Sequence, residues 1–163
     1  MPINLLLAFA LAVQATPTAP TYTVETCSDP VARKAMLAGG PDKFPLFKAL
    51  ADQSEANKAR MTVVLDRLTE RGKLTPDQRR GVVMKMLEDA RFKSALAEAG
   101  PLLEAAMDSM VKMTGKDEAK DCRTVMEMAA SVPRFEANAA KQWEAMRLVL
   151  ESEASKRGIS LGD

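Results

Sequence analysis

Leu74-Thr75-Pro76-Asp77-Gln78 marks the start of a helix more clearly than any other stretch of this chain. Thr75 suits the N-cap position, Pro76 suits the first helical position, and Gln78 completes a capping box with Thr75. Asp77 places a negative charge at the positive end of the helix dipole. The pentapeptide therefore predicts a helix that begins at Thr75.

Apolar residues recur at spacings of three and four on both sides of this stretch, which is the period of an amphipathic helix. Aromatic residues make up only 4% of the chain, and helix-forming residues dominate it. We therefore expect an all-α fold, an irregular bundle of about five to seven helices with mostly antiparallel neighbours. The expected helices span about 29–38, 45–71, 75–99, 103–113, 117–129 and 133–157.

The positions of apolar residues refine this expectation for residues 75–113. Val83 and Leu87 form the predicted apolar edge of the helix that starts at Thr75, whereas Phe92 falls on its charged side. A break near Asp89 would correct the position of Phe92, and Gly100-Pro101 would end the segment that follows. The next helix is predicted to be the cleanest core element, with a buried stripe of Leu103, Ala106, Met107, Met110 and Met113.

The middle of the long 45–71 helix is polar. Asp52 to Arg60 contains no residue larger and more apolar than alanine. Two interpretations stay open: a solvated mid-section, or a close crossing of a neighbour through Ala56 and Ala59.

The amino-terminal residues have the pattern of a secretory signal peptide. Leu5 to Val13 is an uninterrupted apolar run, and Val13-Gln14-Ala15 resembles a cleavage site. Nine apolar residues are too few to span a bilayer, which takes about 20. We therefore expect a signal peptide over 1–15, an extended strap over 16–27, a helical domain over 28–163, and a periplasmic or secreted location without a stable membrane anchor.

The two cysteines are Cys27 and Cys122. In an exported chain an even pair predicts a disulfide bond, here one that fastens the strap to a helix. The alternative, two separate buried thiols, applies if the chain stays in the cytosol.

Composition excludes several classes of function. The chain has no histidine, which removes the commonest general base and the commonest transition-metal ligand. Its 23 basic and 22 acidic residues leave no positive excess for binding nucleic acid. We therefore expect a protein that is not an enzyme, with no catalytic residues and no cofactor.

Methionine is abundant, with eleven residues. Thioethers bind Cu(I), so Met107, Met110 and Met113 form a candidate metal site, although methionines on such a stripe mostly fill a core. A methionine-rich apolar groove also re-packs around many partners, which favours a protein-binding module.

Leu74 to Gln78 also resembles the LTxxQ signature of a family of small, helical, exported stress-response proteins of Gram-negative bacteria, which includes ATP-independent chaperones. That family typically carries a second copy of the motif, which this chain lacks, and its chaperones are cradle-shaped dimers. The resemblance implies a shared compartment and helical habit. Taken together, we expect an exported helical protein-binding module, chaperone-like or related to envelope stress. The alternatives are a periplasmic Cu(I)-binding protein and a non-catalytic structural protein.

Overall fold

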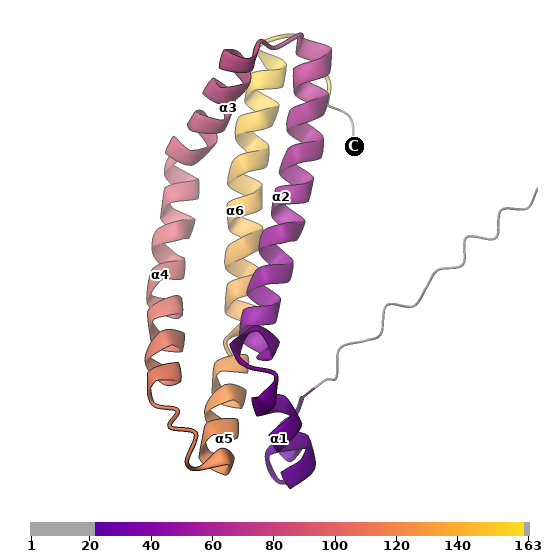
Figure 1. The fold of residues 1–163 in the computed structure, drawn as a ribbon. Coiled ribbons are helices and arrows are strands. Elements are labelled where there is room, and N and C mark those ends of the chain that lie inside the picture. Colours follow the sequence, from indigo (N-terminus) through magenta and orange to yellow (C-terminus); the bar gives the residue numbers. More distant parts are fainter. Residues whose placement is uncertain (1–21, 162–163) are drawn as a thin grey trace, which may run out of the picture.

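The computed structural model describes residues 22–161, which form helices and no strand. The predicted all-α bundle is therefore confirmed over these residues (Figure 1). The α-helices are α1 (Pro30–Ala38), α2 (Pro45–Gly72), α3 (Pro76–Glu88), α4 (Ala90–Val111), α5 (Glu118–Ala129) and α6 (Val132–Ser155), and the short 3-10 helices are η1 (Val24–Cys27) and η2 (Pro41–Lys43).

Three long rods dominate the molecule: α2, α6, and α3 followed by α4 (Figure 1). The rod α6 packs extensively against both of the others, whereas α2 and α4 hardly meet. α4 runs antiparallel to α6, as expected, but α2 and α6 run parallel, which corrects the expectation of antiparallel neighbours. The short elements α1, α5 and η1 pack together at one end, which we call the lower end.

The turn from α2 to α3 is formed as the sequence predicts. Gln78 N donates to the Thr75 hydroxyl at 3.3 Å, and Thr75 N donates to the Gln78 side chain at 2.9 Å, which completes the capping box. Lys73 ends α2 in the left-handed region at φ 48°, and Leu74 N donates to Thr69 O at 3.0 Å. These contacts reverse the chain within three residues.

The predicted break near Asp89 is confirmed. α3 ends at Glu88, and the Asp89 side chain caps α4 by accepting from Arg91 N at 2.9 Å. The prediction that Gly100-Pro101 ends a helix is wrong, because α4 continues through Pro101 to Val111. Proline removes only one N–H, and the carbonyl left without its donor, at Ala97, belongs to an exposed residue that water can reach.

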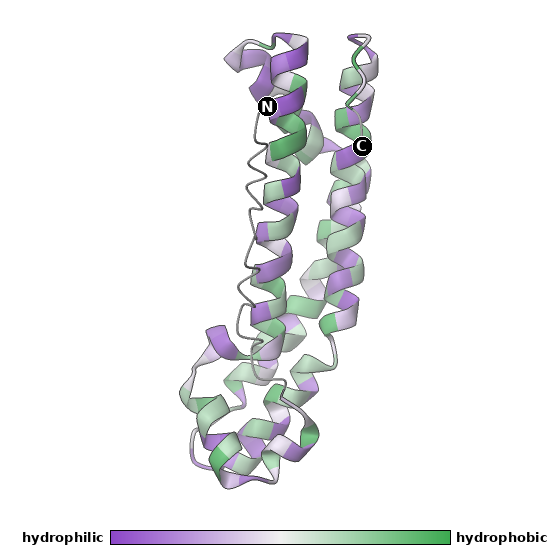
Figure 2. Ribbon diagram, turned by 90° about the vertical axis from the view of Figure 1, so that its right-hand side faces the viewer, coloured by the Kyte–Doolittle hydropathy of each residue, from purple (hydrophilic) through white to green (hydrophobic). Residues whose placement is uncertain are grey.

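The core consists of two apolar clusters, one at each end of the rods. Figure 2 shows apolar and polar residues interleaved along the long helices. The upper cluster joins α2, α3, the start of α4 and α6, and it includes Leu65, Leu68, Val82, Met86, Phe92, Val149 and Leu150. The lower cluster joins η1, α1, α5, the starts of α2 and α6 and the later part of α4, and it includes Cys27, Met36, Leu46, Ala106, Cys122, Val125 and Phe135.

Two predicted registers are wrong. On α3 the buried residues are Val82 and Met86; of the predicted edge, Val83 packs partly against the upper cluster while Leu87 is exposed, because α6 covers the side of α3 that Val82 and Met86 occupy. On α4 only Ala106 of the predicted stripe is buried, because the helix begins at Ala90 and its register follows Phe92 and Ala95.

The segment before α1 is only partly the extended strap expected over 16–27. Thr23 is extended, but Val24–Cys27 forms a 3-10 turn, with Thr26 N donating to Thr23 O at 3.0 Å. The predicted signal peptide over 1–15 and the first residues of the strap lie outside the described residues.

Candidate functional site

A groove runs along α6 between α2 and α4, with a volume of about 520 Å³. We call it the central groove. Its upper end is lined by Met61, Phe92 and Met146, its middle by Ser54, Asn57, Leu96, Ala99, Gly100, Asn138, Ala139 and Gln142, and its lower end by Leu50, Leu103 and Phe135. The groove therefore lies between the two apolar clusters.

The groove exists because the facing sides of α2 and α4 carry small or polar residues at mid-length. Ser54 and Asn57 occupy this side of α2, and Ala99 and Gly100 occupy this side of α4. None of these side chains is long enough to bridge the two helices. Most of the stretch from Asp52 to Arg60 is exposed, Ala59 included, as the solvated interpretation expects, and its hydrogen bond to α6 comes from the buried Asn57.

A network of side-chain amides forms the floor of the groove. Asn57 Nδ2 donates to Ala139 O at 2.9 Å, and Asn138 Nδ2 donates to Ala95 O at 2.7 Å. Gln142 Nε2 donates to Asn138 Oδ1 at 2.7 Å. Because backbone carbonyls only accept hydrogen bonds, these contacts fix the orientation of all three amides. Within residues 22–161, Asn57 Oδ1 and Gln142 Oε1 then remain as acceptors without a donor.

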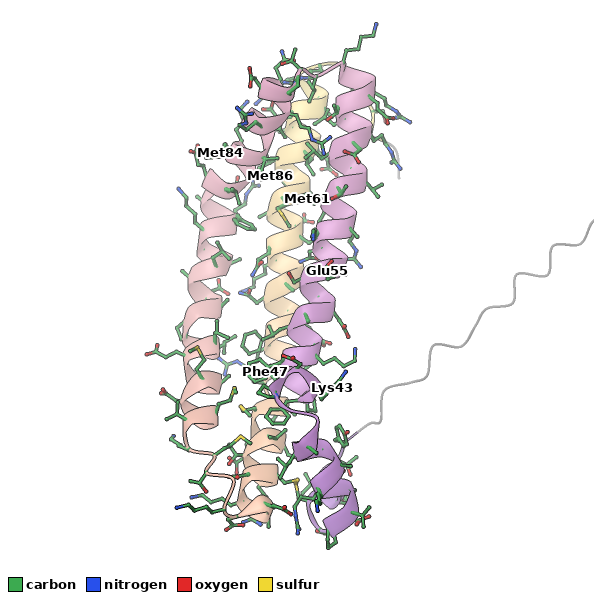
Figure 3. The ribbon with its side chains drawn as sticks, viewed as in Figure 1. Lys43, Phe47, Glu55, Met61, Met84 and Met86 are labelled. Carbon is green, nitrogen blue, oxygen red and sulfur yellow. A yellow bond between two sulfur atoms is a disulfide. The ribbon has the colours of Figure 1, made fainter. Side chains whose placement is uncertain are left out.

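The α4 rim of the groove is apolar and exposed. Leu96 is 47% exposed and Leu103 is 42% exposed, although both residues line the groove. The α2 rim carries Lys58, which pairs with Glu55 at 3.7 Å, and Met61, which projects toward the α3–α4 rod (Figure 3). Exposed leucines beside a concave apolar surface are typical of a surface that binds another chain.

The structure does not gather Met107, Met110 and Met113 on one buried helical face. Met107 is 57% exposed, while Met110 and Met113 pack partly against the lower cluster. α4 ends at Val111, so Met113 lies beyond the helix and helical spacing no longer places it beside Met110. Met84 and Met86, which are two residues apart in the sequence, point to different sides of α3 (Figure 3).

The strongest charge cluster is centred on Glu153 of α6, which is 2% exposed. Its carboxylate accepts from Lys85 Nζ and Lys156 Nζ at 2.9 Å and from Arg157 Nη1 at 2.7 Å. The hydrogen bonds from Lys156, Arg157 and Lys85 lower the pKa of Glu153 to about 2. The group is therefore ionised at neutral pH and ties α3 to α6.

The cysteine pair predicted from the sequence is a disulfide bond between Cys27 of η1 and Cys122 of α5. Arg33 of α1 supports it, since Arg33 Nη1 donates to Cys27 O at 2.9 Å. The bond fastens η1, the first helical element of the described residues, to α5 within the lower cluster. Its two sulfurs are buried, which is typical of a structural disulfide.

Within residues 22–161, cysteine, aspartate and glutamate side chains do not gather in groups of three that could hold a metal ion. Over the same range, no helix is both long and apolar enough to cross a bilayer.

Sequence reasoning missed the central groove. The signal was present in two separate places, the polar stretch of α2 and the pair Ala99-Gly100 of α4, but only the fold brings them face to face.

Comparison with known proteins gives no match to a family model, to a curated protein or to a solved structure.

Proposed function

We propose that this chain is an exported protein-binding module, chaperone-like in action, that holds an apolar helical segment of a partner or unfolded chain in the central groove. The observation that carries the proposal is the groove itself, with exposed Leu96 and Leu103 on its rim.

The geometry suits a helix. α2 and α4 both pack on α6 but hardly touch each other, so the three rods leave one position of a four-helix arrangement open. An amphipathic helix laid there would bury its apolar side against Leu50, Leu103 and Met61. The removal of this apolar surface from water would drive binding.

The test uses the aggregation of a heat-stressed client protein, followed by light scattering. The wild-type protein at a stoichiometric amount is expected to suppress the scattering, and the double variant Leu96→Glu/Leu103→Glu is expected to lose most of this effect. Leu87→Glu on α3 is the matched control, because Leu87 is equally exposed but lies outside the groove. If wild-type protein leaves aggregation unchanged, or if the control variant loses as much as the groove variant, the proposal fails.

Export is the second part of the proposal. The buried disulfide and the lack of a bilayer-spanning helix within residues 22–161 are compatible with it. Mass spectrometry of the protein from its native compartment should find a chain that begins near Thr16 with both cysteines oxidised. An intact leader or free thiols would contradict export.

A further inference from the structure

The central groove is apolar at both ends and polar in the middle. Leu50, Leu103 and Phe135 line the lower end, and Met61, Phe92 and Met146 line the upper end. Between them stand the amides of Asn57, Asn138 and Gln142. A partner segment that matches this surface must therefore be apolar at both ends and polar in the middle.

The amides in the middle present both acceptors and donors. Each amide nitrogen uses one of its two N–H groups, on Ala139 O, Ala95 O or Asn138 Oδ1. Within residues 22–161, Asn57 Oδ1 and Gln142 Oε1 therefore face no donor, and the second N–H of each amide faces no acceptor. Asn57 is only 9% exposed, so a partner helix that covers the groove would remove its remaining water. A buried acceptor without a donor opposes binding.

The distance between the apolar ends fixes the spacing of the partner's anchors. Leu50 and Met61 are eleven residues apart on α2, which is about 16 Å along a helix axis. Eleven residues also return to nearly the same side of a helix, with positions four and seven between them. A partner helix in the groove would thus place anchors at its first and twelfth positions and face the amides with its fifth and eighth.

We propose that the partner segment is an amphipathic helix of about three turns, with apolar anchors eleven residues apart and a neutral side-chain amide, asparagine or glutamine, between them to donate to these oxygens and accept from these N–H groups. This inference rests on the proposed function and names the partner of the same groove. A neutral amide fits better than lysine, because lysine only donates, and because the lining carries one basic and one acidic side chain, Lys58 and Glu136, that leave no net charge for a cation to meet. A helix that is apolar throughout would leave both oxygens unpaired.

The test compares two synthetic helical peptides of 16 residues that share leucine anchors eleven residues apart. One carries asparagine at the fourth and seventh positions after the first anchor, and the other carries leucine there. Binding is measured by fluorescence anisotropy. The wild-type protein is expected to bind the asparagine peptide about ten-fold or more tightly than the leucine peptide, because the leucines leave two buried acceptors unpaired.

Two variants replace a polar amide on the floor of the groove with an apolar side chain. Asn57→Leu and Gln142→Leu should each shift the preference toward the leucine peptide. Gln142 is the safer substitution, because its side chain is only partly buried, and thermal melts of both variants report whether they fold. Leu87→Glu should keep the wild-type preference.

Each other outcome separates the two ideas. Equal affinity of the wild-type protein for both peptides, or a preference for leucine, overturns the partner chemistry but leaves the groove as a binding site. Binding of neither peptide, combined with unchanged client protection by Leu96→Glu/Leu103→Glu, overturns the proposed function as well. Sedimentation that shows a dimer abolished by the groove variant would make a second copy the occupant and overturn the inference.

Discussion

Glu153 is a charge that the fold encloses almost completely and still keeps ionised. Three cations from α3 and the end of α6 surround it: Lys85, Lys156 and Arg157. Burial alone would raise the pKa of a carboxyl group, but here the hydrogen bonds to these cations outweigh burial and lower the pKa to about 2. Because the ammonium groups themselves are exposed, the cluster is stabilising without isolating several charges from water.

Replacing Glu153 with glutamine should lower the free energy of unfolding at pH 7 by about 1–3 kcal/mol, because charge-assisted hydrogen bonds to three donors are weakened. The folded-state pKa lies below the unfolded value, so this stabilisation is complete above about pH 4.5 and is lost as the pH falls toward 2. Urea denaturation of both proteins at pH 7 and pH 2.5 measures the effect. A constant difference between them at the two pH values would show that the charge of Glu153 contributes nothing.

Lys73 carries backbone strain, since it is the one non-glycine residue with positive φ among residues 22–161. A left-handed residue at the end of a helix is usually glycine, because a Cβ is unfavourable there. Lys73→Gly should therefore raise the free energy of unfolding by up to about 1 kcal/mol. The same denaturation experiment checks it, and Lys43→Gly, at an exposed residue outside the left-handed region, should not stabilise.

Helix boundaries in this chain are predictable where a side chain caps the backbone, and less predictable where the prediction uses only the general tendency of glycine and proline to end helices. The starts at Thr75 and Asp89 follow from capping and from the misplaced register of Phe92, and both are confirmed. The prediction that Gly100-Pro101 ends a helix was wrong, because a proline need not end a helix when water can reach the carbonyl that loses its donor. The buried stripe of α4 then differed from the prediction, because its register follows from the start at Ala90 and not from a new helix after Pro101. The start of α3 was predicted correctly, and its buried residues, Val82 and Met86, depend on which side of it α6 covers.

Asp89 should be the most sensitive position of the α3–α4 joint. Its side chain caps α4 through Arg91 N and Phe92 N and also binds the Arg91 guanidinium, and this ion pair lowers the pKa of Asp89 to about 2. Asp89→Ala is expected to cost about 1 kcal/mol of unfolding free energy through the lost cap. Asp77→Ala, in the exposed first turn of α3, should cost clearly less. Equal losses in chemical denaturation would contradict the special role of Asp89.

The fold as a whole places a polar, open middle between two apolar clusters. Composition and periodicity were enough to predict an all-α bundle and the long helices α2 and α6, because those depend on local pattern. The parallel pairing of α2 with α6 and the central groove were not predictable, because they depend on which helices meet. Asn57 illustrates the difference: its position in a polar stretch suggested exposure, and only its contact with Ala139 across the bundle explains its burial.

The lower cluster depends on the disulfide more than the upper cluster does. η1 and α1 pack mainly on each other and on α5, and the Cys27–Cys122 bond is the covalent part of that contact. The bond joins residues 95 apart, so the chain-entropy model assigns it on the order of 4–5 kcal/mol as an upper value. Reduction should therefore loosen α1 and α5 while the packing of α3 on α6 persists.

Reduction with dithiothreitol should lower the melting temperature by roughly 10–20 °C, given the usual relation between stability and melting temperature for a domain of this size. Hydrogen exchange on the reduced protein should quicken first in α1 and α5, and later in the part of α6 that packs with the upper cluster. The double variant Cys27→Ser/Cys122→Ser should have the melting temperature of the reduced protein, and dithiothreitol should not change it. An oxidised protein whose melt does not move on reduction, with the sulfurs shown to be free, would mean that the lower cluster holds η1 without the bond.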